Sequence, residues 1–301
     1  MSLIDAWVQR ALRTGLRVGM KWGGQLPLDL TALRAGLNAG SSLLKPRREC
    51  RIVHHRMDGV PVVEVCTNNA NPEHVVVAMH GGAFFAGSPA THLALASEIA
   101  VRANARVLLP DYRLAPEHAY PAALLDGLAV LKRLLAQGLD PSRLCLCGDS
   151  AGASLVLSMA LAMKDSGLQQ PVCMVLLSPF VDLTLTAPSV HSNAKLDPLL
   201  SRIPLMRGAQ AYCGQIELDD PRVSPLFAPL QGLPPLLIQC GSDEILLDDA
   251  QRLAQAAQAA GVSVQCEVYP RMWHDFQVFG AWLKDADHAL WQIAQFIRNP
   301  L

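Results

Sequence analysis

The chain has 301 residues, of which 51% are hydrophobic and 17% are charged, and its formal net charge is −1. A composition this apolar is typical of a chain that buries a sizeable core, and not of a disordered tail. The near-neutral charge offers no basic field, so we expect no nucleic-acid partner. No run of 18 uninterrupted apolar residues occurs, so a membrane-spanning helix is not expected.

The first 50 residues are predicted to be largely helical. Apolar residues recur there at helical spacing: Ile4, Trp7, Val8, Ala11 and Leu12. Basic residues lie on the other side: Arg10, Arg13, Arg17 and Lys21. Such a helix could lie on a membrane, or it could be a lid that packs on its own domain with its arginines in water. We regard the membrane as the less favoured alternative, because short basic amphipathic stretches are common in proteins without membrane contact.

The charges and cysteines bear on the compartment. Asp5, Arg10 and Arg13 interrupt any apolar stretch of a secretory signal, so we expect a cytoplasmic protein. The eight cysteines form no CxxC pair, and Cys145 and Cys147 share one face of an apolar strand. We interpret them as buried thiols in a reducing compartment rather than as metal or redox sites.

The order of predicted elements indicates the fold class. Asp58-Gly59 between two β-rich runs predicts a hairpin. Beyond it, strands are predicted at 74–79, 105–109, 143–147, 172–177, 235–240 and 263–269. They alternate with predicted helices at 91–103, 121–136, 151–166, 247–260 and 281–298. This alternation predicts an α/β fold with a mostly parallel sheet flanked by helices. The stretch 183–222, rich in Pro, Ser and Asp, is predicted to be an insertion with structure of its own.

The segment GDSAG, at 148–152, lies where a predicted strand meets a predicted helix. A turn this sharp crowds the backbone around Ser150, and Gly148 and Gly152 lack the side chains that would collide there. The serine is then held at the carboxyl end of a central strand, next to a helix N-terminus. A helix-capping serine is the alternative, but the full context favours a catalytic nucleophile.

A serine hydroxyl needs a general base within hydrogen-bond reach. In hydrolases of this architecture the acid and then the base follow the serine in the chain. His274 comes after the strand at 263–269, so we expect it in a loop at the same edge as Ser150. Five other histidines precede the parallel sheet or lie among helices or in the insertion: His54, His55, His92, His118 and His191.

The base in turn needs a carboxylate that orients it. Asp243 follows the strand at 235–240 directly, and we predict that it is this acid. Three rivals follow it closely: Glu244, Asp248 and Asp249. We expect these to serve the first turn of the next helix.

The tetrahedral intermediate needs hydrogen-bond donors for its oxyanion. A predicted strand ends at His80, and the glycines that follow let backbone N–H groups approach a substrate closely. We therefore predict an oxyanion hole that includes Gly81 and Gly82, with the N–H of Ala151 as a further donor.

These motifs resemble the hormone-sensitive-lipase-like branch of the α/β-hydrolases, also called bacterial family IV esterases. HGGAFFAGS at 80–88 resembles its oxyanion signature, GDSAG its nucleophile elbow, and DYRLAPEHAYPAA at 111–123 its most characteristic stretch. DEILLDD at 243–249 and MWHDF at 272–276 resemble its acid and base loops. Ala83 departs from the pattern, since relatives have a third glycine there. The resemblance is weak over the first 50 residues and over 183–222.

The resemblance implies one α/β-hydrolase domain over 1–301, with a helical cap built from 1–48 and 183–222. It implies a carboxylic ester hydrolase that works through an acyl-enzyme on Ser150, with His274 and Asp243 completing the triad. No metal or organic cofactor is needed for that chemistry. A capped pocket favours small-molecule esters of short-to-medium acyl length.

Some alternatives stay open. Lactonase, amidase or dehydratase chemistry could use the same site, and a membrane-associated lipase could dock through the N-terminal helix. Hormone receptors of this fold lack the base, so the presence of His274 argues against that role. Relatives often dimerise through the last strand and helices, and the pattern of 281–298 is compatible with a homodimer.

Overall fold

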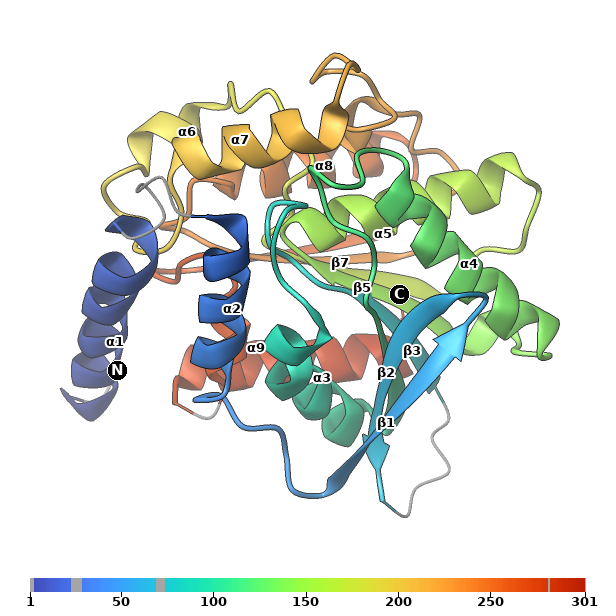
Figure 1. The fold of residues 1–301 in the computed structure, drawn as a ribbon, viewed down its shortest axis with the longest axis horizontal. Coiled ribbons are helices and arrows are strands. Elements are labelled where there is room, and N and C mark those ends of the chain that lie inside the picture. Colours follow the sequence, from blue (N-terminus) through green and yellow to red (C-terminus); the bar gives the residue numbers. More distant parts are fainter. Residues whose placement is uncertain (1–2, 23–28, 69–73, 281, 301) are drawn as a thin grey trace.

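The structure is a computed structural model that describes residues 3–22, 29–68, 74–280 and 282–300. An eight-stranded sheet forms its centre, in the order β1-β2-β4-β3-β5-β6-β7-β8 (Figure 1). The strands are β1 (Cys50–Met57), β2 (Val60–Thr67), β3 (His74–Met79), β4 (Ala105–Pro110), β5 (Leu144–Asp149), β6 (Cys173–Leu177), β7 (Leu236–Gly241) and β8 (Val264–Tyr269). Strand β2 runs antiparallel to both neighbours, and β3 to β8 are parallel. The predicted α/β class is confirmed.

Helices cover both faces of the sheet, as predicted (Figure 1). On one face, α3 (Pro89–Ala103) packs beside α9 (Lys284–Arg298). The other face carries α4 (Ala122–Ala136), α5 (Ala151–Asp165) and α8 (Leu247–Ala259). Each predicted strand and helix of this region agrees with the observed bounds to within three residues.

The hairpin between β1 and β2 also forms where the sequence predicts it. Both turn residues have a left-handed backbone, with φ of 46° at Asp58 and 89° at Gly59. Two consecutive positive φ angles make the tight turn whose twist matches that of the flanking strands. Met57 consequently pairs with Val60 across the turn.

The core consists of one apolar layer on each side of the sheet. Alternate strand residues such as Leu146, Met174 and Ile238 point towards α5 and α8. The intervening residues point towards α3 and α9, among them Cys145, Cys147 and Cys173. All three thiols are free and buried, so the interpretation of Cys145 and Cys147 as small apolar side chains on one face is supported.

Two segments far apart in the sequence lie over the carboxyl end of the sheet (Figure 1). The first contains α1 (Leu3–Leu16), the π-helical η1 (Arg17–Trp22) and α2 (Leu30–Ser41). The second, within the predicted insertion, contains α6 (Pro188–Ser192) and α7 (Arg202–Cys213). Short 3-10 helices lie at Pro141–Arg143, Pro225–Phe227 and Phe276–Phe279. Residues 1–2 and 23–28 of the first segment lie outside the described residues.

The N-terminal helical segment docks through its basic side chains. In η1, Arg17 donates to the carbonyl oxygen of Lys195 at 2.8 Å, and Lys21 donates to that of Asp197 at 2.6 Å. Val8 and Leu12 pack against a buried cluster, whereas Trp7 is 78% exposed. The expectation that the arginines would lie in water is therefore wrong for Arg17, because main-chain oxygens attract these cations. No described helix has the length and apolar character needed to cross a membrane.

Candidate active site

Ser150 stands on the sharp turn that the sequence predicts, between β5 and α5. Its backbone has a positive φ of 52° with a ψ of −121°. Such a conformation costs on the order of 1–3 kcal/mol in a non-glycine residue. A side chain at Gly152 would collide with the Met79 carbonyl oxygen, and one at Gly148 would collide with Gly152. Both glycines are thus required by close backbone contact, and this packing holds the strained serine at the strand end.

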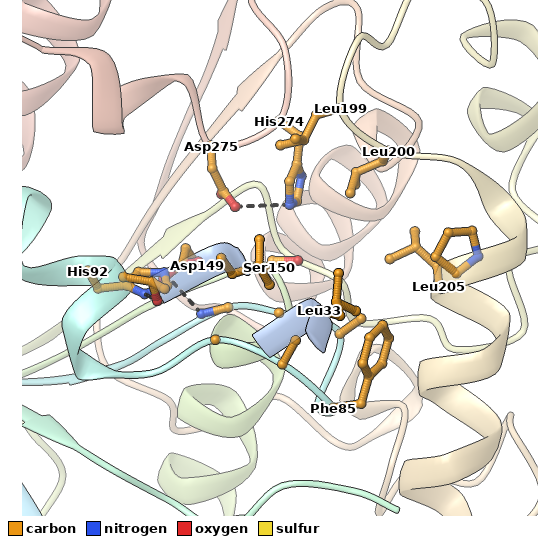
Figure 2. A pocket seen from close by; sticks show the side chains of 18 of the residues that line it. Leu33, Phe85, His92, Asp149, Ser150, Leu199, Leu200, Leu205, His274 and Asp275 are labelled. Atoms are coloured by element: carbon orange, nitrogen blue, oxygen red, sulfur yellow. Dashed lines mark hydrogen bonds and ion pairs between the residues drawn. The ribbon is translucent and has the colours of Figure 1, made fainter. Parts of the chain in front are cut away.

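His274 lies in the loop after β8, and its side chain is only 3% exposed. Its Nδ1 lies 3.0 Å from Oε2 of Glu244, and its Nε2 lies 3.0 Å from Oδ2 of Asp275 (Figure 2). The structure brings this imidazole to the same pocket as Ser150, and both residues line its wall. The expected loop position of His274 at the edge that carries Ser150 is therefore what the structure has.

The predicted pairing of His274 with Asp243 is not the one that forms. The Asp243 carboxylate instead meets Arg13 of α1 at 2.6 Å, while the neighbouring Glu244 is fully buried against the imidazole. Glu244 also accepts the Gly241 N–H at 3.0 Å, which fixes its longer side chain under the loop. Adjacent residues point apart in such a turn, so the cation on α1 draws one carboxylate outward and the other turns inward.

The two remaining rivals lie in the first turn of α8, as expected, and their carboxylates bind main-chain N–H groups of the segment that follows β6. Asp248 accepts the Ser189 N–H at 2.7 Å, and Asp249 accepts the N–H groups of Val181 and Asp182 at 3.0 Å each. Burial raises the pKa of Asp249 to about 8. Neither carboxylate makes a hydrogen bond or ion pair with His274, so Glu244 is the rival that takes the place predicted for Asp243.

The predicted oxyanion donors lie next to the serine. Gly81 and Gly82 line the pocket with Ser150, and Ala151 begins α5. Within the described residues, the N–H groups of Gly82 and Ala151 donate to no protein acceptor, while that of Gly81 has a long contact of 3.4 Å to Nε2 of His92. Two backbone donors are thus available beside the nucleophile. Ala83, in place of the family's third glycine, has a left-handed φ of 50°.

The stretch 111–123 braces the glycine loop from behind. The Tyr112 hydroxyl donates to the His80 carbonyl oxygen at 2.6 Å, and the Ala115 N–H donates to that of Phe84 at 3.0 Å. Arg113 pairs with Asp126 of α4 at 2.8 Å, an ion pair within the fold and outside the pocket lining. This stretch therefore supports the oxyanion loop without lining the pocket.

A second imidazole, which the sequence argument set aside, also belongs to the site. His92 of α3 places Nε2 3.0 Å from Oδ2 of Asp149, the residue before the nucleophile (Figure 2). Although burial opposes it, the Asp149 charge raises the pKa of His92. Its distance in sequence from the triad concealed it, and only its place just after the glycine loop could have indicated it.

The cavity above these groups has a volume of about 280 Å³. Its outer wall is apolar and comes from the two cap segments and the glycine loop: Leu33, Leu37, Phe85, Leu199, Leu200, Pro204 and Leu205 (Figure 2). The polar groups gather at its floor, around Ser150 and His274. In the described part of the chain, no group of three His, Cys, Asp or Glu side chains is arranged to hold a metal ion.

Comparison with known proteins shows which proteins share this fold and sequence. The profile of the alpha/beta hydrolase fold family matches residues 76–278. The chain is 42% identical over 297 residues to an esterase of Acinetobacter venetianus, with 98% of each chain covered. It is 39% identical over 221 residues to an acetyl-hydrolase of Streptomyces hygroscopicus, which covers 73% of this chain and 74% of that one.

A solved structure has the same fold over nearly all of the chain. An esterase from the bacterial hormone-sensitive lipase family superposes with a TM-score of 0.92 at 36% identity, covering 99% of this chain and 98% of that one. The sheet order and the serine elbow define the class as an α/β-hydrolase. The chain belongs to the bacterial hormone-sensitive-lipase family of α/β-hydrolase esterases, and the resemblance found in the sequence is confirmed.

Proposed function

We propose that this enzyme hydrolyses short-to-medium acyl esters through an acyl-enzyme on Ser150, with His274 as general base and Glu244 as the acid that orients it. One observation carries the proposal: the strained Ser150 shares a pocket floor with a buried imidazole whose Nδ1 lies 3.0 Å from a buried carboxylate. That combination is the one that turns a weak hydroxyl into a nucleophile.

The mechanism follows from these groups. Unprotonated Nε2 of His274 takes the Ser150 proton as the serine attacks the ester carbonyl, and the Nδ1–H donates to Glu244. The N–H groups of Gly82 and Ala151, with that of Gly81, stabilise the oxyanion, each such donor contributing about 10²–10³ in rate. His274 then protonates the leaving alcohol, and a water repeats the cycle on the acyl-enzyme.

The pocket supports an uncharged acyl group of limited length. Its outer wall holds leucine, proline and phenylalanine side chains, so an apolar chain gains from burial there while a charged one loses its hydration. We propose that α1, α2, α6 and α7 act together as the cap that limits this length. The acetyl-hydrolase among the relatives fits a small acyl group.

A series of p-nitrophenyl esters from acetyl to palmitoyl tests the substrate class. We expect kcat/KM to peak among the shorter chains and to fall steeply towards palmitoyl. A peak at palmitoyl, or cleavage of amides or lactones in preference to every ester, would contradict the proposal. Cytoplasmic location and a homodimer stay predictions, which fractionation and sedimentation would test.

A further inference from the structure

His274 lies between two carboxylates, of which the mechanism uses only one. Glu244 faces Nδ1 and Asp275 faces Nε2, each at 3.0 Å. The Glu244 contact is a hydrogen bond that a proton on Nδ1 satisfies, and the Asp275 contact at Nε2 is an ion pair that is favourable when the imidazole is charged. The arrangement therefore fits the doubly protonated imidazolium, in which Nε2 has no lone pair for the Ser150 proton.

The contact with Asp275 depends on an unusual backbone conformation. Side chains of consecutive residues ordinarily point apart, but Asp275 has a left-handed φ of 54°, which lets its carboxylate reach the imidazole of the preceding residue. Its N–H donates to Oγ of Ser178 at 3.1 Å. Ser178 is itself buried in a left-handed conformation, with φ of 44°. The loop is thus built to hold this carboxylate where it is.

Asp275 has little other polar work within the described residues. Its second oxygen, Oδ1, is buried with no hydrogen-bond partner, and its one ion pair is that with Nε2 of His274. A buried carboxylate oxygen without a donor is costly, so the residue is not explained by support of the fold. Its chemistry is directed at the imidazole.

We propose that Asp275 is a positioning residue that holds His274 in its charged form in the resting enzyme, so that the catalytic base appears only when Nε2 loses its proton to solvent. This inference rests on the proposed function of His274. It makes a carboxylate outside the triad one of the two groups that set the pH at which the acidic limb of the pH–rate profile lies.

Other acidic groups near the His274 imidazole also favour its charged form, and His92 offsets one of them. Glu244 and Asp197 are acidic groups buried near it, and Asp149 faces it from the end of β5. His92 offsets Asp149: its Nε2 lies 3.0 Å from Oδ2 of Asp149, and although burial opposes it, the Asp149 charge raises the pKa of His92.

Burial raises the pKa of Asp275 and that of Glu244, and the charge of the imidazolium between them opposes that rise. Burial lowers the pKa of His274, but the carboxylates of Asp275 and Glu244 outweigh it and raise that pKa well above the usual value. Removing the Asp275 charge leaves burial less opposed, so the pKa must fall. Activity would then begin at a lower pH.

The test is the pH dependence of kcat/KM for p-nitrophenyl butyrate in the wild type and in Asp275→Asn. Asparagine tolerates the left-handed backbone, so the loop conformation is retained. We expect the acidic limb to move to lower pH by about one unit or more. At a pH below the wild-type limb, the fraction of plateau kcat/KM that the variant retains should then be about tenfold higher than the wild-type fraction, or more. Asp287→Asn, which removes a carboxylate on α9 outside the pocket, should leave the limb in place, and Asp275→Glu should restore it in part.

A limb that does not move, or moves up, in Asp275→Asn would overturn the inference. So would a loss of activity at every pH with the limb unchanged, because that is the mark of a merely structural role. The rate at which a fluorophosphonate labels Ser150 gives the same profile without an ester, so a wrong substrate class would not obscure the result. Nitrogen-15 NMR of histidine in the wild type provides a check without any variant, with two protonated ring nitrogens expected on His274 at pH 7 and a neutral ring contradicting the proposal.

Discussion

Glu244 and Asp243 are adjacent carboxylates, and a pair of matched variants tests which of them orients His274. Glu244→Gln keeps the size of the buried side chain but removes the charge 3.0 Å from Nδ1 of His274. At an effective dielectric constant of about 20, an imidazolium and a carboxylate at that distance attract by about 5 kcal/mol. Losing that stabilisation as the imidazolium forms corresponds to roughly 10³–10⁴ in kcat.

Asp243→Asn should behave differently, because its carboxylate lies on Arg13 and not on the imidazole. We expect kcat to change less than about tenfold and the main effect to be a slightly lower stability, since partly exposed ion pairs contribute about 1 kcal/mol or less. Steady-state kinetics on p-nitrophenyl butyrate at the pH plateau, with melting curves for both variants, measures each effect. A large loss of kcat in Asp243→Asn with an active Glu244→Gln would refute the assignment and restore the pairing first predicted.

Three further outcomes follow from other contacts. Arg13→Ala removes the cation that meets Asp243, donates to the Arg271 carbonyl oxygen and stacks 5.1 Å from the Trp273 ring; differential scanning fluorimetry should show a loss of about 1–2 kcal/mol, and an unchanged Tm would contradict the docking of α1. Leu205→Ala widens the apolar end of the pocket and should raise the octanoate-to-butyrate ratio of kcat/KM about tenfold, whereas exposed Leu196→Ala should not. Burial raises the pKa of Asp249 to about 8, above its unfolded value. The carboxyl therefore ionises first in the unfolded state, and the wild type loses stability as pH rises towards 8. The Tm of Asp249→Asn minus that of the wild type should grow from pH 5 to pH 8, and a constant difference would count against this.

The sheet and its helices could be read from the sequence because their signals are local. Apolar runs such as 143–147 and the glycines around Ser150 specify strand, turn and helix without reference to distant residues. The nucleophile and the base follow from the chain order that this architecture imposes, since parallel strands bring their carboxyl ends to one edge. The same logic positions the glycines of the oxyanion loop.

The choice between Asp243 and Glu244 could not be made this way. Both residues occupy the same loop, and what separates them is Arg13, which lies 230 positions away in the sequence and meets Asp243 only after α1 has docked. The roles of His92 and Asp275 were hidden for a similar reason. The role of His92 depends on its contact with Asp149 across the fold, and that of Asp275 depends on its left-handed backbone.

The role of Ser150 is tested most directly by comparing the wild type with Ser150→Ala on p-nitrophenyl butyrate, together with fluorophosphonate labelling of both proteins. We expect the wild type to hydrolyse the ester and to be labelled once, on Ser150. The variant should lose turnover by about 10⁶ and accept no label. Retention of ester hydrolysis or of label by Ser150→Ala would contradict the central claim that this serine is the nucleophile.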